Sequence, residues 1–183
     1  MAKRYTADML ICIGGFWGSG SRELEKKLIR KGFHSIDISN YHEKRGFIDK
    51  DGLFRERAVP PKSDDDRMRL FRRLIEDFPR LSKMYPNIVI RATLHRSAPR
   101  RYLVSGARPY FDRVHLAWLS CSQEVRERRA REWISEETPR FGKKERRDEA
   151  AQSEFQDLDP SEHAVIFDTT DGVDLERFMQ LLR

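Results

Sequence analysis

The sequence has no long apolar segment and only two cysteines among its 183 residues. No stretch approaches the roughly 18 to 20 apolar residues that cross a bilayer, and Met1–Asp8 lacks the apolar run of a signal peptide. We therefore expect a cytoplasmic protein without membrane contact. Cys12 and Cys121 sit in apolar runs, which fits buried, reduced thiols better than a disulfide framework. The cysteines and the scattered histidines give no metal-ligand spacing, so we expect no structural metal.

Charged residues are abundant, but the two signs are unevenly spread along the chain. They make up 36% of the sequence and give a net charge of +6. The charged residues of Glu154–Glu176 are all acidic, so the basic excess lies upstream, in Arg96–Arg108 and Arg126–Arg147. Such a balance suits a pocket for a polyanionic small molecule such as a nucleotide. It is also compatible with nucleic acid, a partner to which we give less weight.

Apolar residues, 38% of the chain, fall in short runs that alternate with helical patterns. This content excludes a disordered polyelectrolyte, and the length fits one domain. We expect strands at Met9–Ile13, Phe33–Ile38, Asn87–Ile90, Val114–Leu119 and Ala164–Phe167. We expect a first helix whose apolar positions are Leu24, Leu28 and Ile29. Four further helices are expected, at Ser63–Leu81, Pro99–Arg108, Ser122–Ile134 and Leu175–Leu182. Such alternation predicts an α/β fold whose parallel sheet has helices on both faces.

Residues Tyr41–Ser63 fit neither pattern. They are polar and contain Gly46, Gly52, Pro60 and Pro61. We assign them to an irregular or partly helical excursion over the edge of the sheet.

The first predicted strand runs into a glycine-rich turn, residues Gly14–Arg22. In an open α/β sheet, ligands bind beyond the carboxyl ends of the strands, and the turn after the first strand often holds phosphate. Glycines let backbone N–H groups point inward without a Cβ clash, and the following helix adds the positive partial charge of its N-terminus. We therefore expect an anion site here; the alternative is a turn that binds nothing.

This turn resembles the P-loop of small-metabolite and nucleoside monophosphate kinases. In that family, Gly-x-x-Gly-x-Gly is followed by lysine and then by serine or threonine. The three glycines of this motif correspond to Gly15, Gly18 and Gly20. The residues between them, Phe16, Trp17 and Ser19, resemble those of shikimate-kinase-like loops. The resemblance implies a site for ATP or another nucleoside triphosphate, with or without Mg²⁺.

Two positions of the turn depart from the family pattern. Ser21 stands in place of the lysine that bridges the outer phosphates, and Arg22 in place of the magnesium-binding hydroxyl. Three explanations stay open: Ser21 and Arg22 serve in exchanged order, another basic residue reaches in, or catalysis has been lost.

The ends of the second and third strands also resemble this family. Asp37 matches a strand-end acid that contacts magnesium or the accepting hydroxyl, which makes it a candidate general base or a metal contact through water. The alternative is a solvated Asp that caps the next turn. Arg91 stands where the family has an acidic metal-organising residue. Arg91 and Arg96 are either contacts for an anionic substrate or solvated side chains.

Leu116–Arg131 resembles the fourth strand and following helix of nucleoside monophosphate kinases, where lid arginines close over the transferring phosphate. Arg126 and Arg129 fall in the matching cluster, and Arg140 lies along the expected lid. The alternative for Glu124–Glu149 is a salt-bridged solvent face. The segment from Arg147 through Pro160 resembles the one that precedes the last strand in cytidylate kinases. Phe167–Thr170 and the helix from Val173 resemble that family's ending, which implies that the loop after the last strand packs near the adenine.

Together these features predict a single P-loop kinase-like domain over residues 1–183. We expect a three-layer α/β/α P-loop NTPase fold with a five-stranded parallel sheet, a substrate-side excursion at approximately 41–83 and a helical lid at approximately 132–158. The function that the resemblance implies is ATP-dependent phosphate transfer to a small anionic molecule or nucleotide. The alternative is a catalytically inactive nucleotide- or anion-binding protein that regulates a protein partner.

Overall fold

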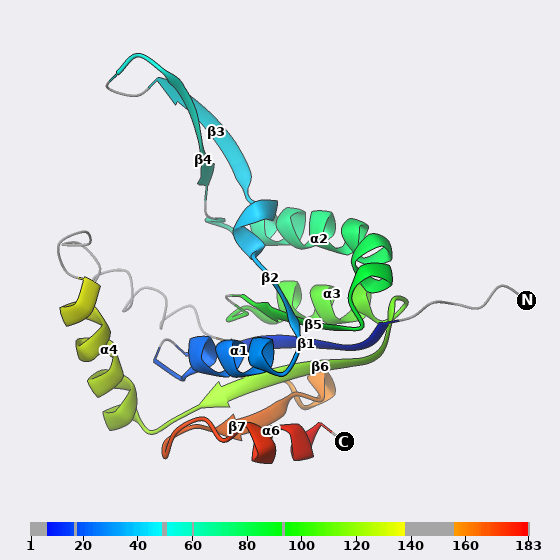
Figure 1. The fold of residues 1–183 in the computed structure, drawn as a ribbon, viewed down its shortest axis with the longest axis vertical. Coiled ribbons are helices and arrows are strands. Elements are labelled where there is room, and N and C mark those ends of the chain that lie inside the picture. The colour runs from blue at the N-terminus through cyan, green and yellow to red at the C-terminus, as the bar shows by residue number, and fades with distance from the viewer. Residues whose placement is uncertain are drawn as a thin grey trace, which may run out of the picture.

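The protein is built around a parallel five-stranded sheet (Figure 1). The structure is a computed structural model that describes residues 7–16, 18–48, 51–59, 61–92, 94–137 and 156–182. The strands follow the order β2-β5-β1-β6-β7, with parallel pairing throughout. They are β1 (Ala7–Gly15), β2 (His34–Ile36), β5 (Asn87–Arg91), β6 (Phe111–Ser120) and β7 (Val165–Asp168). All five strands predicted from the sequence are confirmed.

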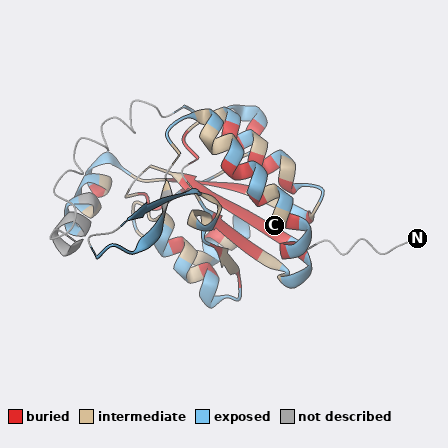
Figure 2. Ribbon diagram, turned by 90° about the horizontal axis from the view of Figure 1, so that it is seen from above, coloured by how far each residue is buried: buried red, intermediate tan, exposed pale blue. Residues whose placement is uncertain are grey.

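The central strand β1 is buried on both faces (Figure 2). Leu10 and Cys12 belong to one apolar cluster, whereas Ile11 and Ile13 belong to the other. A strand with helices on both sides needs such a continuous apolar run. Burial also raises the pKa of the Cys12 thiol to about 12, so this thiol stays protonated at neutral pH.

Helices cover both faces of the sheet and complete a three-layer α/β/α arrangement. Helices α2 (Asp64–Met84) and α3 (Ser97–Ala107) pack in one apolar cluster. Helices α1 (Ser21–Arg30) and α6 (Leu175–Leu181) pack in the other. Helix α4 (Gln123–Glu137) follows β6 and stands at one side of the body (Figure 1). Within the described part of the chain, every helix is too short or too polar to cross a membrane.

Helix α2 begins where the sequence predicts. Ser63 Oγ accepts a hydrogen bond from the N–H of Asp66 at 3.1 Å, and the Asp66 carboxylate accepts one from the N–H of Ser63 at 3.1 Å. This capping box satisfies backbone N–H groups at the helix start. The helix then buries one stripe of side chains, formed by Leu70, Phe71, Leu74, Phe78 and Leu81.

Helix α1 departs from its prediction at one position. Leu24 and Leu28 are fully buried, but Ile29 is 46% exposed. Residues four apart share a helix face, whereas Ile29 lies about 100° further round than Leu28. The buried stripe of α1 is therefore narrower than predicted.

The described residues between 43 and 59 form a β-hairpin, which corrects the predicted irregular or partly helical excursion; Tyr41, at its start, is helical. A 3₁₀ helix, η1 (Ile38–Tyr41), leads into β3 (Glu43–Ile48), which pairs antiparallel with β4 (Phe54–Val59). The hairpin stands away from the sheet (Figure 1), and all six residues of β3 are exposed. Alternation of apolar and polar residues arises when one face of a strand is buried. Because β3 buries neither face, the sequence carries no such signal.

A fully buried ion pair fixes the chain ahead of β7, and the sequence reading missed it. Arg100 of α3 binds Glu162 of the 3₁₀ helix η2 (Pro160–Glu162), with Arg100 Nη2 2.6 Å from Glu162 Oε2. Arg100 Nη1 donates to the carbonyl of Leu94 at 2.9 Å, and the guanidinium lies 5.1 Å from the ring centroid of Trp118. These contacts replace the water that both charges lose on burial.

Most of the predicted lid lies outside the described residues, and the lid therefore stays a prediction. Helix α4 covers its start up to Glu137, and the described chain resumes at Gln156. The N–H of Gln156 donates to the carbonyl of His95, and Gln156 Oε1 accepts from the N–H of Ser97 at 2.8 Å. The end of the predicted lid segment is thus joined to the start of α3.

Replacing Glu162 by Gln should destabilise the protein by about 3–5 kcal/mol, because the Arg100 charge would stay buried without its counter-charge. Urea unfolding measures the change. The matched control is Glu176→Gln, which removes the exposed Glu176–Lys31 pair and should cost less than about 1 kcal/mol. Equal losses in the two variants would contradict a structural role for the buried pair.

Candidate functional site

The parallel strands bring the predicted site segments to one edge of the sheet. Strand β1 ends at Gly15, β5 at Arg91 and β6 at Ser120. The connection after β1 crosses to the β2–β5 side, whereas the connection after β5 crosses to the β6 side. Such a reversal is where open α/β sheets bind ligands.

The glycine-rich turn closes tightly between β1 and α1. Gly18 and Gly20 have φ angles of 80° and 83°, in the left-handed region that glycine adopts without strain. The N–H of Ser19 donates to the carbonyl of Phe16 at 3.0 Å, and Gly20 is the N-cap of α1. The first N–H groups of α1, which a helix cannot pair internally, therefore follow the turn directly. Trp17 lies outside the described residues.

Ser19 carries a buried hydroxyl inside this turn. The residue is 1% exposed, and within the described structure its Oγ has no hydrogen-bond partner. A Cβ on Gly15 would lie 2.8 Å from this Oγ, so a side chain at position 15 would crowd the hydroxyl. Buried polar atoms are normally paired, so an unpaired hydroxyl indicates a ligand or a water molecule.

Side chains from two distant segments hold the carbonyl oxygens of the turn. Arg129 of α4 donates through Nη1 to the Gly18 carbonyl at 3.3 Å and through Nη2 to the Thr169 carbonyl at 2.7 Å. Thr169 Oγ1, just after β7, donates to the Ser19 carbonyl at 2.8 Å. Cys121 Sγ lies 3.8 Å from the Gly18 oxygen and is partly exposed, which corrects the expectation of a buried thiol. It lies at the end of β6, where the apolar run stops.

Arg126 of α4 lies at the same turn. Its guanidinium lies 4.9 Å from the ring centroid of Phe16. A Cβ on Gly18 would lie 2.9 Å from the Arg126 carbonyl, so α4 approaches the turn closely. Arg140, the third predicted arginine, lies outside the described residues.

The first turn of α1 holds the two positions that depart from the family pattern. Ser21 is partly buried and begins the helix, and Arg22 follows it with an exposed side chain. A guanidinium in this place adds positive charge next to the helix N-terminus. It cannot act as a ligand for a metal cation.

Asp37 lies at the end of β2 and caps η1. Its Oδ1 accepts from the N–H of Ser39 at 2.9 Å, and the carboxylate is exposed. Hydrogen bonds from the side chain and the backbone of Ser39 hold the pKa of Asp37 below its usual range, and the charges of His42 and Arg91 add to this effect. Asp37 is thus ionised at neutral pH and able to accept a hydrogen bond from an incoming hydroxyl.

The two arginines predicted to contact substrate each lie in an ion pair. Arg91 Nε is 2.6 Å from Glu25 Oε2 on α1, and Glu25 Oε1 accepts from Ser35 Oγ at 2.7 Å. Arg96 Nε is 3.2 Å from Asp64 Oδ2 at the start of α2. Arg91 therefore neighbours Asp37 at the sheet edge, whereas Arg96 joins α2 to α3.

Sequence reasoning placed Thr169 in the loop after the last strand by resemblance but missed its contact with the glycine-rich turn, and it missed Glu25 altogether. Thr169 follows the last predicted strand and is fully buried, a position where a hydroxyl needs backbone acceptors. Its location after a strand was the available signal. Glu25 gave none, because its partner Arg91 is 66 residues away in sequence.

Gly18→Ala should destabilise the protein more than Gly32→Ala does, as measured by denaturant unfolding. Both glycines have positive φ, 80° and 91°, so alanine is strained at both. A Cβ meets nothing within 4 Å at Gly32, but it meets the α4 backbone at Gly18. We expect about 1 kcal/mol at Gly32 and at least twice that at Gly18. Equal losses of stability in the two variants would show that α4 moves away from the added methyl group without an energetic cost.

Ser39→Ala should raise the pKa of Asp37 toward the ordinary value, as read by NMR titration of its carboxyl carbon. A depressed folded-state pKa contributes stability above the unfolded value near 3.8, and that stability is lost as the pH falls through the folded pKa. The variant should therefore lose less stability than wild type on acidification below about pH 4. Asp168, whose pKa is lowered by Thr170, is the internal control and should not move.

Comparison with known proteins identifies the fold. No protein-family model and no curated protein matches the chain. Among solved structures, a sugar kinase from a Janibacter species is similar, with a TM-score of 0.65, 17% identity, and coverage of 96% of this chain and 94% of that one. The APS kinase of Mycobacterium tuberculosis, solved with AMPPNP and APS, has a TM-score of 0.61 and 17% identity, with coverage of 97% and 98%.

A gluconokinase from Sinorhizobium meliloti is also similar, with a TM-score of 0.57 and 16% identity over 98% of this chain and 91% of that one. At these identities the likeness establishes the fold alone. The strand order and the glycine-rich turn after β1 agree with it. The chain therefore has the P-loop NTPase α/β fold in the form seen in these kinases.

Proposed function

We propose that the protein is a P-loop kinase that transfers the terminal phosphate of ATP or another nucleoside triphosphate to a small molecule. The observation that carries this proposal is the glycine-rich turn at the carboxyl end of β1, with the buried Ser19 hydroxyl inside it, which has no hydrogen-bond partner among the residues that the structure describes. The similar structures support it, since the three named above are kinases and one was solved with AMPPNP.

In this proposal the backbone at the start of α1 and the Arg22 side chain hold the phosphates together. The first N–H groups of α1 donate to phosphate oxygens, and the helix adds the positive partial charge of its N-terminus. The Ser19 hydroxyl is a further donor. Arg22 supplies the positive charge that lysine supplies in the family pattern.

The residues present do not fit the usual magnesium site. Arg22 occupies the place of the hydroxyl ligand. Arg91 occupies the place of the metal-organising acid and is paired with Glu25 at 2.6 Å. We therefore assign charge neutralisation to guanidinium groups and route no step through a metal ion.

Asp37 orients the acceptor in this scheme. The acceptor oxygen forms a bond to the terminal phosphorus while the bond from phosphorus to the nucleoside diphosphate oxygen breaks. The hydroxyl proton passes to Asp37 and then to water. Arg126 neutralises charge on the transferring group, Arg129 positions the turn through Gly18, and Arg140 acts from the predicted lid, which excludes water.

A second candidate function is an inactive protein that binds nucleotide or another anion and regulates a protein partner. The observation that favours it is the Arg91–Glu25 pair, which places a cation at the position where a kinase of this pattern has an acid. Turnover distinguishes the two candidates, because both predict binding in the turn.

Millimolar ATP should raise the melting temperature of the wild-type protein, and Arg22→Ala should abolish the rise. A ligand at about 100 times its dissociation constant adds roughly 2.7 kcal/mol of stability. The control is Arg30→Ala, at the far end of the same helix, which should keep the rise. Since the magnesium ligands do not fit, the rise should persist with a chelator.

Phosphate transfer from labelled ATP to a panel of small molecules then separates the two candidates. Transfer by the wild type that is lost in Asp37→Asn supports the kinase. Binding without transfer to any acceptor supports the inactive form. No stabilisation by any nucleotide, with magnesium or with chelator, would contradict the kinase and leave only an inactive protein that binds a different anion.

A further inference from the structure

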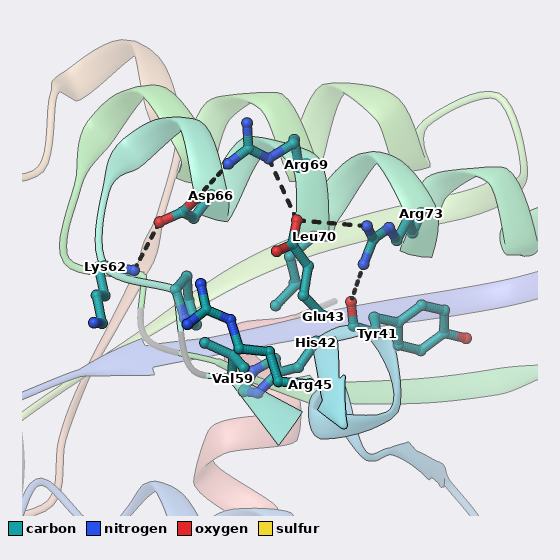
Figure 3. Close-up of a pocket in the computed structure, with 11 residues that line it drawn as sticks. Tyr41, His42, Glu43, Arg45, Val59, Lys62, Asp66, Arg69, Leu70 and Arg73 are labelled. Atoms are coloured by element: carbon teal, nitrogen blue, oxygen red, sulfur yellow. Dashed lines mark hydrogen bonds and ion pairs between the residues drawn. The ribbon is translucent and has the colours of Figure 1, made fainter. Parts of the chain in front are cut away.

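A pocket lies between the base of the hairpin and the start of α2, separate from the glycine-rich turn (Figure 3). Its cavity volume is about 110 Å³. That is below the range of sites that enclose a whole drug-sized ligand, and it suits a single small group such as a phosphate. We call it the hairpin pocket. Tyr41 and His42 line it at the end of η1, Arg45 and Val59 line it from the hairpin, and Arg73 lines it from α2.

The hairpin pocket carries an excess of positive charge. Its charged lining residues are Glu43, Arg45, Lys62, Asp66, Arg69 and Arg73. Four cations against two carboxylates leave a net charge of +2. The Asp66 carboxylate is already committed. It caps α2, where backbone hydrogen bonds, first from Lys62, lower its pKa to about 2, and it pairs with Arg69 Nη2 at 2.5 Å.

Glu43 is a loosely held counter-ion in this pocket. Its Oε1 lies 3.7 Å from Arg69 Nε and 3.7 Å from Arg73 Nη2 (Figure 3). Both distances exceed a good hydrogen bond, and all three side chains are about half exposed, so the pairs are weak. Within the described part of the chain, the side chains of Arg45 and Lys62 have no carboxylate partner. An incoming anion can therefore take the place of Glu43 without breaking a strong interaction.

The position of the pocket relates it to the proposed chemistry. Asp37 and Tyr41 are joined by η1 alone, and a 3₁₀ helix rises about 2 Å per residue, which puts the two residues roughly 8 Å apart. Asp37 stands at the carboxyl edge of the sheet. A small molecule anchored in the hairpin pocket can therefore reach toward Asp37 with its other end.

We propose that the hairpin pocket binds the phosphate group of a phosphorylated small-molecule acceptor, which displaces Glu43 from between Arg69 and Arg73. The acceptor role rests on the proposed function; the binding site does not. Guanidinium groups match phosphate oxygens in geometry, and the net +2 of the lining balances a phosphomonoester dianion.

Isothermal titration with inorganic phosphate and with ribose 5-phosphate at pH 8, without nucleotide, tests the site. Arg73→Gln should weaken binding at least tenfold, whereas Arg72→Gln, one residue away on the exposed surface of α2, should not. Arg45→Gln should weaken it severalfold, whereas Lys44→Gln, on the opposite face of β3, should not. Thermal unfolding verifies that each variant folds, and the Arg45 pair gives the answer if Arg73→Gln does not fold.

Glu43→Gln provides a test of opposite sign. Removing this competing carboxylate should tighten the binding of both phosphate probes at least threefold, a gain that a purely structural role for Glu43 does not produce. Unchanged or weaker binding in this variant would overturn the proposed displacement. Tighter binding of gluconate than of ribose 5-phosphate would overturn the assignment to phosphate.

The glycine-rich turn is a competing site for phosphate, and Arg22→Ala separates the two. Binding that is lost in Arg22→Ala and unchanged in the Arg73 and Arg45 variants would lie in the turn and would overturn the hairpin pocket. Failure of the proposed function gives a different result. In that case ATP does not stabilise the protein, while phosphate still binds in the hairpin pocket.

Discussion

Side chains from α4 and from the segment after β7 donate hydrogen bonds to the carbonyl oxygens of the glycine-rich turn. The conformation of the turn, and with it the candidate site, depends on these bonds. Arg129 reaches the Gly18 carbonyl from α4, and Thr169 reaches the Ser19 carbonyl from the segment after β7. Each peptide unit has one donor and one acceptor. With these acceptors satisfied by protein, the first N–H groups of α1, which the helix does not pair internally, point to the place where an anion can bind. These bonds join the turn after β1 to α4 and to the segment after β7.

The charge of the site is distributed differently from that of the kinases it resembles. Guanidinium groups stand where a hydroxyl and an acid are expected, at Arg22 and Arg91, and a third, that of Arg126, lies over Phe16. Arg91 is balanced by Glu25, which keeps the end of β5 close to α1. In the proposed kinase, fixed cations of this kind would neutralise phosphate without the coordination geometry that a metal requires. Because they attract any anion, selectivity would then have to come from the acceptor side.

The sequence predicts those parts of the structure in which burial of one or both faces produces a regular pattern of apolar residues. Strand β1 is apolar throughout because both its faces are covered, and α2 shows a stripe that ends at Leu81. The hairpin shows no such pattern of apolar residues, because β3 is exposed on both faces. Ile29 was misplaced because spacing alone does not give the width of a buried stripe.

Contacts between distant segments were equally invisible in the sequence. Arg100 and Glu162 are 62 residues apart, and nothing in either neighbourhood marks a buried charge. The glycine-rich turn and the strand-end position of Asp37 were predictable, because both can be recognised from the residues next to them in the sequence. The hairpin pocket was not, because it needs the hairpin and α2 side by side.

The two cysteines differ in a way that makes the protein convenient for spectroscopy. Cys12 is fully buried and keeps its proton up to high pH, so thiol reagents at neutral pH cannot use it in the folded state. Cys121 is partly exposed and lies against the Gly18 carbonyl. A fluorophore or spin label attached to the native protein would therefore collect at one position, beside the glycine-rich turn. Its signal would report occupancy of that turn without any engineered cysteine.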